Sequence, residues 1–215
     1  MSDIFREVDE ELRQDRMKAL AKRYGGAAAA AALLVVAGTA GYVGWKHWRD
    51  QGRREASQAL EAAMMKAAAG GEDGVKALSE LAGKTSGEIA GLARLSAGAA
   101  LTRDGKLAEA AQVYDSLAAD AAAPAWQRDL ATLMSVARQV ERGEPAALTS
   151  RLAPLLAPAN PWRFQAKELA GLLAARAGDR AKAQTYFQQL ADDAQAPAGV
   201  RARAADLAAH YGRAG

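Results

Sequence analysis

The chain has 215 residues, with 28 basic and 25 acidic side chains, a formal net charge of +3 and no cysteine. The lack of cysteine excludes disulfide frameworks, thiolate metal sites and cysteine nucleophiles, and the near balance of charge does not fit the clustered basic surface of a nucleic-acid binder. Alanine occurs 57 times, whereas there are only nine valines and two isoleucines. Because alanine is the best helix former and β-branched residues favour strands, we predict an all-α protein.

Residues 1–23 are predicted to form a short amphipathic helix. Ile4, Phe5, Val8 and Leu12 recur at helical spacing, with acidic residues on the other faces. Three alternatives remain open for this segment: it rests on the membrane surface, it is frayed in solution, or it docks onto a membrane partner from the cytosol.

Residues 24–45 form a stretch of 22 residues without a charge. About 20 helical residues cross a hydrocarbon core of about 30 Å. Tyr24 marks one end of the stretch, while Tyr42, Trp45 and Trp48 gather at the other, as in the aromatic belts of membrane proteins. We therefore predict a single transmembrane helix over residues 24–45.

Two alternatives to this span remain open, namely a cleavable signal peptide that ends at Ala40 and a buried helix of a soluble protein. The 23 residues before Tyr24 carry six acidic and six basic side chains, unlike the short positive leader of a signal peptide. Six Lys and Arg residues precede the stretch, and four follow within 20 residues. The positive-inside rule then places residues 1–23 in the cytoplasm and residues 46–215 across the membrane.

Beyond the span, we predict a helical linker and a degenerate first hairpin over residues 46–85, followed by a repeat domain over residues 86–215. Two segments of this domain share one frame: a glycine, a second glycine seven residues on, an alanine five further and an aromatic residue four further. The repeat-packing residues are Gly98, Gly105, Ala110 and Tyr114 in one copy and Gly171, Gly178, Ala183 and Phe187 in the other.

Each position of the frame has a physical reason. The first glycine and the alanine let two helices approach closely, and the second glycine can take the left-handed conformation that ends a helix. The aromatic ring fills the gap between consecutive hairpins. A middle copy near Gly143 is degenerate, because Leu148 replaces the alanine and Leu152 replaces the aromatic residue. The alternative is an irregular alanine-rich bundle.

This frame resembles the tetratricopeptide repeat, a unit of two antiparallel helices that stack into a solenoid. In such stacks the first helices line a concave surface that accepts a segment of a partner protein. Counting from Gly98 and Gly171, the candidate partner-binding groove consists of Leu92, Leu95, Thr102, Arg103, Gln165, Glu168, Leu172 and Arg176.

The sequence contains no recognisable catalytic constellation. Its two histidines, His47 and His210, lie far apart, and there is no glycine-rich phosphate loop, nucleophile elbow or acidic metal cluster. We predict that the protein is not an enzyme, and we expect no cofactor, no metal, no small-molecule substrate and no nucleic-acid partner. An enzyme with an unrecognised site is the remaining alternative.

The order of parts is a charged N-terminal helix, one span and a repeat domain. With the opening MSDIFREVDEELRQDRMKALAKRYG, this order resembles the ancillary SecYEG translocon subunits, the YfgM-like membrane proteins of bacteria. The resemblance implies a non-catalytic scaffold of the inner membrane, with its N-terminus in the cytoplasm and its repeats in the periplasm. The implied partners are the Sec translocon, periplasmic chaperones and exported chains. The alternative is a periplasmic repeat protein that coordinates envelope assembly or cell division.

Overall fold

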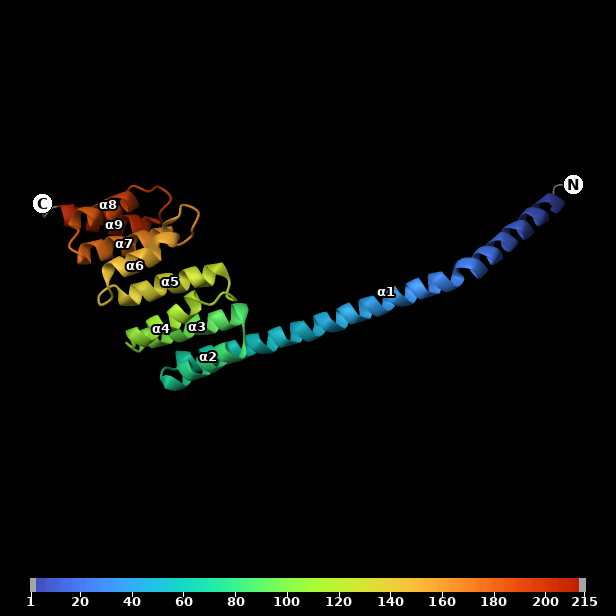
Figure 1. The fold of residues 1–215 in the computed structure, drawn as a ribbon, viewed down its shortest axis with the longest axis horizontal. Helices are drawn as coiled ribbons and strands as arrows, with labels where there is room; N and C mark the ends of the chain where they lie inside the picture. The colour runs from blue at the N-terminus through green and yellow to red at the C-terminus, as the bar shows by residue number, and fades with distance from the viewer. Residues whose placement is uncertain (1–2, 213–215) are drawn as a thin grey trace. The chain divides into compact units, whose positions relative to one another are not determined.

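The computed structural model describes the backbone of residues 3–212, and the side chains of residues 17, 18, 22, 23, 26 and 33–212. Every regular element within residues 3–212 is helical, which confirms the all-α prediction (Figure 1). The elements are α1 (Asp3–Ala68), α2 (Glu72–Lys84), α3 (Gly87–Arg103), α4 (Leu107–Ala118), α5 (Ala125–Gln139), α6 (Pro145–Leu152), the 3-10 helix η1 (Ala153–Leu156), α7 (Arg163–Arg176), α8 (Arg180–Ala191) and α9 (Ala198–Gly212).

The chain divides into two units, residues 1–55 and residues 56–215. In the first unit, α1 continues without a break through the predicted boundaries after residues 23 and 45. The side chains of the predicted amphipathic face, Ile4, Phe5, Val8 and Leu12, lie outside the described residues, as do those of residues 24, 25 and 27–32 in the predicted span. Among the residues that the structure describes, no helix combines the length and apolar character that a membrane crossing requires.

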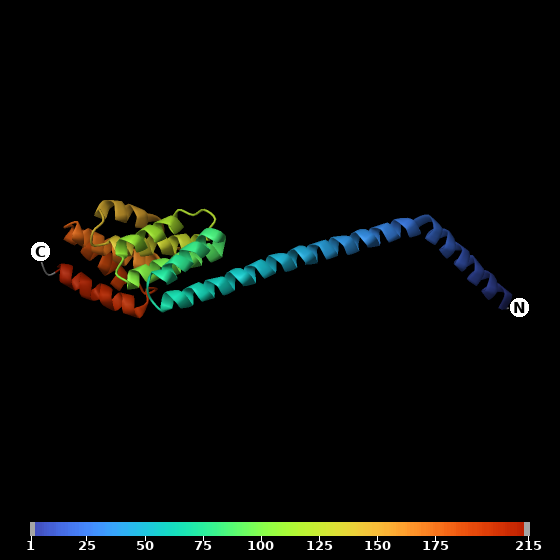
Figure 2. The ribbon, with the colours of Figure 1, turned by 90° about the horizontal axis from the view of Figure 1, so that it is seen from below.

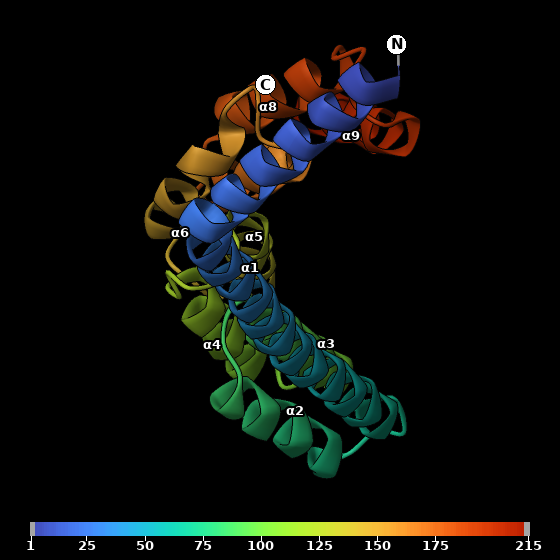
Figure 3. The same cartoon turned by 90° about the vertical axis from the view of Figure 1, so that its right-hand side faces the viewer.

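The second unit is a stack of helical hairpins. The end of α1 pairs with α2, α3 with α4, α5 with α6 and η1, and α7 with α8, while α9 follows as a single helix. Helices that follow one another in the chain run in opposite directions within a hairpin (Figures 1 and 2), and the hairpins follow one another along an arc from α2 to α8 (Figure 3). The first helices of successive hairpins, α3, α5, α7 and α9, contact one another in that order.

Glycine turns end the first helices of the two matching hairpins. Gly105 follows α3 with φ +76°, and Gly178 follows α7 with φ +82°. Both values lie in the left-handed region, where glycine avoids the clash between a Cβ atom and the backbone. In the middle hairpin, Glu144 instead begins α6, and its carboxylate accepts hydrogen bonds from the backbone N–H groups of Ala146 and Ala147.

The core consists of several small clusters in which alanine is the commonest residue. One cluster combines Leu60, Ala63 and Ala67 of α1 with Leu78 of α2 and Ala93 of α3. The first hairpin therefore shares a core cluster with α3 of the following hairpin. Helices with such small side chains pack closely against one another. A Cβ atom added at Gly74 in α2 would lie 2.3 Å from the Cα atom of Ala67 in α1.

The last helix, α9, covers the end of the stack. The ring of Tyr211 stacks on Phe187 of α8 with 5.7 Å between ring centroids. Ala204 and Ala208 of α9 are buried against α7 and α8. A terminal helix of this kind shields the apolar face that the last hairpin would otherwise expose.

Candidate partner-binding face

The two matching hairpins place an aromatic ring directly on a glycine. A Cβ atom added at Gly98 of α3 would lie 2.5 Å from the ring of Tyr114 on α4. One added at Gly171 of α7 would lie 2.7 Å from the ring of Phe187 on α8. Each ring therefore closes its own hairpin, and it also faces the next first helix, since Tyr114 clusters with Ala131 of α5 and Phe187 with Ala208 of α9.

The remaining repeat-packing residues lie at these contacts or at the turns. Ala110 and Ala183, near the start of α4 and α8, are completely buried, while Gly105 and Gly178 form the turns. In the middle hairpin, Leu148 and Leu152 are buried between α5 and α7. These leucines thus occupy the core positions that alanine and an aromatic residue occupy in the matching hairpins.

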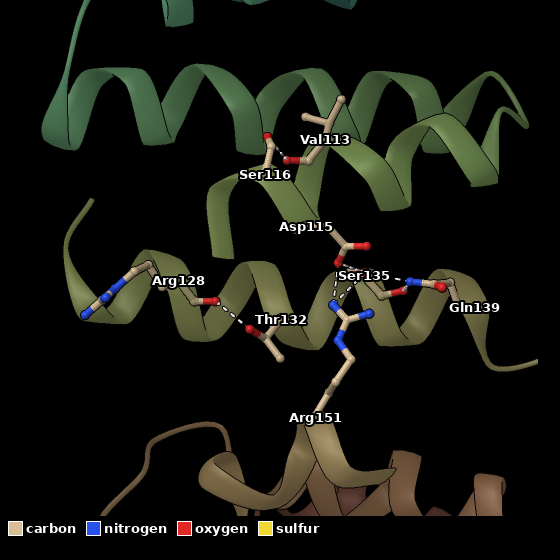
Figure 4. Close-up of polar contacts among 8 residues, drawn as sticks. All are labelled: Val113, Asp115, Ser116, Arg128, Thr132, Ser135, Gln139 and Arg151. Atoms are coloured by element: carbon tan, nitrogen blue, oxygen red, sulfur yellow. Dashed lines mark hydrogen bonds and ion pairs between the residues drawn. The ribbon is translucent and has the colours of Figure 1, made fainter. Parts of the chain in front are cut away.

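A polar network joins the second and third hairpins (Figure 4). The hydroxyl group of Ser135 on α5 is completely buried and donates to the carboxylate of Asp115 on α4. Arg151 of α6 donates to both of these side chains, and Gln139 of α5 donates to the Ser135 hydroxyl over 2.8 Å. Each of these side chains hydrogen-bonds to another member of the network, so the network holds α4, α5 and α6 together. Its polar groups are therefore engaged with one another rather than forming a ligand site.

On α3, the predicted groove residues take part in packing within the stack. Leu92 and Leu95 are half-buried against the core clusters. Thr102 donates its hydroxyl proton to the carbonyl oxygen of Gly98 over 2.8 Å. Arg103 donates to the carbonyl oxygen of Ala67 at the end of α1 over 2.5 Å.

The phenol of Tyr114 ends close to these α3 residues. Burial raises its pKa, and a hydrogen bond with Thr102 opposes that shift. The face of the ring covers Gly98 of α3.

On α7, the predicted groove residues are occupied in a similar way. Glu168 forms a bidentate ion pair with Arg203 of α9, with both N–O distances at 3.1 Å. Leu172 packs against the cluster that includes α9. Arg176 donates to the carbonyl oxygens of Val140 and Gly143 beyond the end of α5.

Gln165 is the exception among these α7 residues. Its Oε1 atom is buried and has no hydrogen-bond partner within the described part of the chain. An uncompensated buried oxygen costs free energy, so a donor from water or from a partner would be accommodated there.

The structure thus separates six of the eight candidates by role. Arg103, Arg176 and Glu168 hold neighbouring helices together, whereas the half-buried Leu92, Leu95 and Leu172 leave part of their surface on the face of the first helices. Partner binding would therefore rest on apolar contact rather than on free charges from these positions.

Two features escaped the sequence prediction. Trp126, at the start of α5, is 45% exposed on the first helix of the degenerate hairpin, where the frame gave no positions to count. Arg103 and Arg176, 73 residues apart, each bind carbonyl oxygens of the preceding hairpin. Both arginines lie two residues before a turn glycine, Gly105 or Gly178, and this shared spacing alone had assigned them to the groove.

Comparison with known families agrees with this architecture. The tetratricopeptide repeat-like domain matches residues 18–209. The match covers most of the chain, so the protein belongs to this family. No curated protein matches the chain, and no solved structure does either.

Proposed function

We propose that the protein is a non-catalytic scaffold, anchored in the bacterial inner membrane, that binds other proteins through its repeat domain. The observation that carries the proposal is the repeat fold itself: stacked hairpins of this family present a layer of first helices, and such layers bind segments of partner proteins. Exposed Trp126 and the half-buried leucines of α3 supply apolar surface on these helices.

Membrane anchoring through residues 24–45 is supported by the sequence and by exposure. Leu33, Leu34, Val35 and Val36 are all at least 65% exposed, although they are consecutive and point to every side of α1. Such an apolar surface is stable in contact with lipid, whereas its contact with water is unfavourable. The hydroxyl group of Thr39 donates to the carbonyl oxygen of Val35 over 2.7 Å, so this polar group is satisfied within the helix.

The ends of the proposed span carry the groups expected at a membrane interface. The guanidinium group of Arg49 lies 4.5 Å from the ring centroid of Trp45, and Tyr42 lies beside the same ring. The family match begins at residue 18 and so includes the uncharged stretch. The excess of six over four Lys and Arg residues supports an orientation with the N-terminus in the cytoplasm and the repeats in the periplasm.

The proposed partners are the Sec translocon, periplasmic chaperones and exported chains. This part of the proposal rests on the resemblance of the whole layout to the ancillary SecYEG translocon subunits. A tethered repeat domain fits such a role, because fixing the domain to the membrane raises its effective concentration beside a membrane channel.

Crosslinking in native membranes tests the scaffold. A photo-crosslinking amino acid at Ala99, which is exposed on α3, is compared with one at Gln112, which is exposed on α4. We expect a translocon subunit or a periplasmic chaperone to crosslink through Ala99 and not through Gln112. Equal crosslinking through both positions, or none through Ala99, would contradict binding by the first helices.

Three further measurements test the anchor. Carbonate extraction should leave the wild-type chain in the membrane and release Val36→Arg, because a charge at the middle of the span is costly. Mass spectrometry should find an uncleaved N-terminus, whereas cleavage after Ala40 would favour a released periplasmic protein. Protease added to the cytoplasmic side should spare residues 55–215.

A further inference from the structure

Directly after its uncharged stretch, the helix α1 carries a group of basic side chains. Residues 46–54 include four Lys or Arg residues and a single acidic residue, Asp50. Three of the basic residues recur three or four positions apart and therefore share one face of the helix, which we call the basic face. Its members are Lys46, Arg49 and Arg53. This part of α1 therefore concentrates positive charge on one side.

The cations of the basic face have no polar partner among the side chains that the structure describes. All three are exposed, and none of them forms a hydrogen bond or an ion pair there. Asp50, at the edge of the face, forms no ion pair with them. The other nearby carboxylate, that of Glu55, accepts a hydrogen bond from Gln51 over 3.2 Å. The positive charge of the face is therefore free to attract an anion.

Two aromatic rings continue the basic face toward the uncharged stretch. Tyr42 and Trp45 are 60% and 53% exposed, and their ring centroids lie 6.5 Å apart. The guanidinium group of Arg49 lies 4.5 Å from the centroid of the Trp45 ring. A contact with the face of a ring leaves the N–H donors of the guanidinium group free for an anion. One face of α1 thus passes from apolar side chains to aromatic rings and then to cations.

The spacing of these groups along the helix matches the layers of a bilayer. A helix rises about 1.5 Å per residue, so Trp45 lies about 16 Å and Arg49 about 22 Å from the middle of residues 24–45. The hydrocarbon core ends about 15 Å from the bilayer centre, and the headgroup region ends at about 20–22 Å. Helical side chains lean toward the N-terminal end of their helix, which brings the long side chain of Arg53 back toward the headgroups. In an upright span, the rings therefore lie at the hydrocarbon boundary and the cations among the headgroups.

We propose that the basic face binds the headgroup of an anionic phospholipid. The side chains of Lys46, Arg49 and Arg53 bind its phosphate group. The rings of Tyr42 and Trp45 contact its glycerol backbone and the upper part of its acyl chains. Arginine suits this role, because its N–H groups can bind two phosphate oxygens at once. The proposal rests on the proposed membrane anchor, to which it adds the class of lipid and the face of the helix that binds it.

Native mass spectrometry of the full chain tests the site. The purified chain in detergent is mixed with equal amounts of phosphatidylglycerol, which is anionic, and phosphatidylethanolamine, which carries a phosphate group but is zwitterionic. The lipids that stay bound to the chain are then counted. We expect the wild type to retain about ten molecules of phosphatidylglycerol for each molecule of phosphatidylethanolamine, because the attraction of several cations for an anionic headgroup adds up. Equal retention of the two lipids would overturn the proposal.

Two neighbouring arginines provide a matched pair of variants. Arg53→Gln removes a cation from the basic face and should lower the ratio of retained lipids about fivefold. Arg54→Gln removes the same charge at nearly the same depth, but from another side of the helix, and should leave the ratio close to that of the wild type. Circular dichroism checks that both variants keep their helical content. Equal losses for the two variants would show that only net charge attracts the lipid, and the basic face would not be a site.

Inorganic phosphate distinguishes a lipid site from a site for a free anion. Phosphate added to the lipid mixture should displace phosphatidylglycerol no more than chloride does at the same ionic strength, because a free ion cannot reproduce the contacts of the two rings. If phosphate displaces the lipid and chloride does not, the face binds a free anion and its assignment to a phospholipid is wrong.

Carbonate extraction separates this proposal from that of the anchor. Arg53→Gln should stay in the membrane as the wild type does, because its uncharged stretch is unchanged. If the wild type resists extraction but retains the two lipids equally, the lipid site is wrong and the anchor stands. If carbonate releases the wild type, the anchor is wrong and the lipid site fails with it.

Discussion

The matching hairpins, α3–α4 and α7–α8, and the middle hairpin, α5 with α6 and η1, fill the space between their helices differently. In the matching hairpins a large ring lies on a glycine, as Phe187 does on Gly171. In the middle hairpin Leu148 and Leu152 fill the core, and a buried polar network through Ser135 is added. The difference teaches that the stack requires a filled volume at each hairpin, whereas the frame of residue types that identifies the repeat is only one way to fill it.

The helix break in the middle hairpin shows the same tolerance. The helix α6 ends at Leu152 and the short helix η1 begins at Ala153, because Pro154 lacks the N–H group that would continue the hydrogen bonds of α6. Leu155 of η1 is nevertheless buried beside Leu152. The chain thus maintains its packing across a break that removes the sequence pattern.

The largest expected effect on stability compares the buried ring of a matching hairpin with a buried leucine of the middle hairpin. Phe187→Ala should lower the free energy of unfolding by about 3–5 kcal/mol, because it removes a completely buried ring and leaves a cavity beside Gly171. Leu152→Ala in the middle hairpin removes a smaller side chain and should lower it by less, toward the lower end of the range of about 2–5 kcal/mol for such changes. Urea denaturation followed by circular dichroism measures both. A larger loss for Leu152→Ala would show that the middle hairpin is the better packed of the two.

Replacing the glycine beneath the ring should have the next largest effect. Gly171→Ala should cost about 1–3 kcal/mol, because the added methyl group would overlap the Phe187 ring. The smaller side chain of Phe187→Leu makes room, so the double variant should be more stable than the sum of the two single changes predicts, by at least about 0.5 kcal/mol. Additive losses would contradict the contact between the Phe187 ring and Gly171.

Gly83→Ala is the control for that experiment. Gly83 also lies in a helix, but a Cβ atom there would meet nothing within 4 Å. Alanine should therefore stabilise α2 by about 0.5–1 kcal/mol through its higher helix propensity. If alanine lowers the free energy of unfolding equally at Gly83 and at Gly171, the loss at Gly171 does not arise from contact with the Phe187 ring.

The sequence predicted the all-α fold and the glycine turns because both depend on local chemistry. The alanine excess indicates helices, and the positive φ of Gly105 and Gly178 follows from the need to end one helix and reverse the chain. The roles of the predicted groove residues could not be separated from the spacing alone, because a side chain that the spacing assigns to the face of the first helices can still hydrogen-bond to a neighbouring hairpin. Arg103 and Arg176 do so by binding the preceding hairpin, and only the three-dimensional stack shows which carbonyl groups lie within reach.

The arginine contacts should contribute less than the core. Arg176→Ala should lower the free energy of unfolding by about 1 kcal/mol, because it removes the hydrogen bonds to Val140 and Gly143. Arg103→Ala should have a similar effect at the end of α1. Arg142→Ala, at an exposed position between α5 and α6, is the control and should change stability by less than about 0.5 kcal/mol. If all three variants behave alike, the contacts do not hold the hairpins together.

The smallest expected effect distinguishes the contacts of two carboxylates, those of Glu144 and Glu72, by their response to pH and salt. Hydrogen bonds from the backbone N–H groups of Ala147 and Ala146 lower the pKa of Glu144, and the hydrogen bond and charge of Lys106 lower the pKa of Glu72. A carboxyl group whose pKa is lower in the folded state stabilises the fold above its unfolded pKa of about 4.3, and this contribution disappears as the pH falls through the folded value.

The difference in unfolding free energy between the wild type and Glu144→Gln should therefore shrink as the solution is acidified below about pH 4, and the same should hold for Glu72→Gln. Added salt at neutral pH should reduce the Glu72 difference more, because an exposed ion pair is screened whereas a bond to a neutral N–H group is screened less. Urea titrations at several pH values and salt concentrations measure both differences. Equal salt dependence at the two residues would show that Glu144 is also held by a charge pair, in contrast to the geometry of its backbone hydrogen bonds.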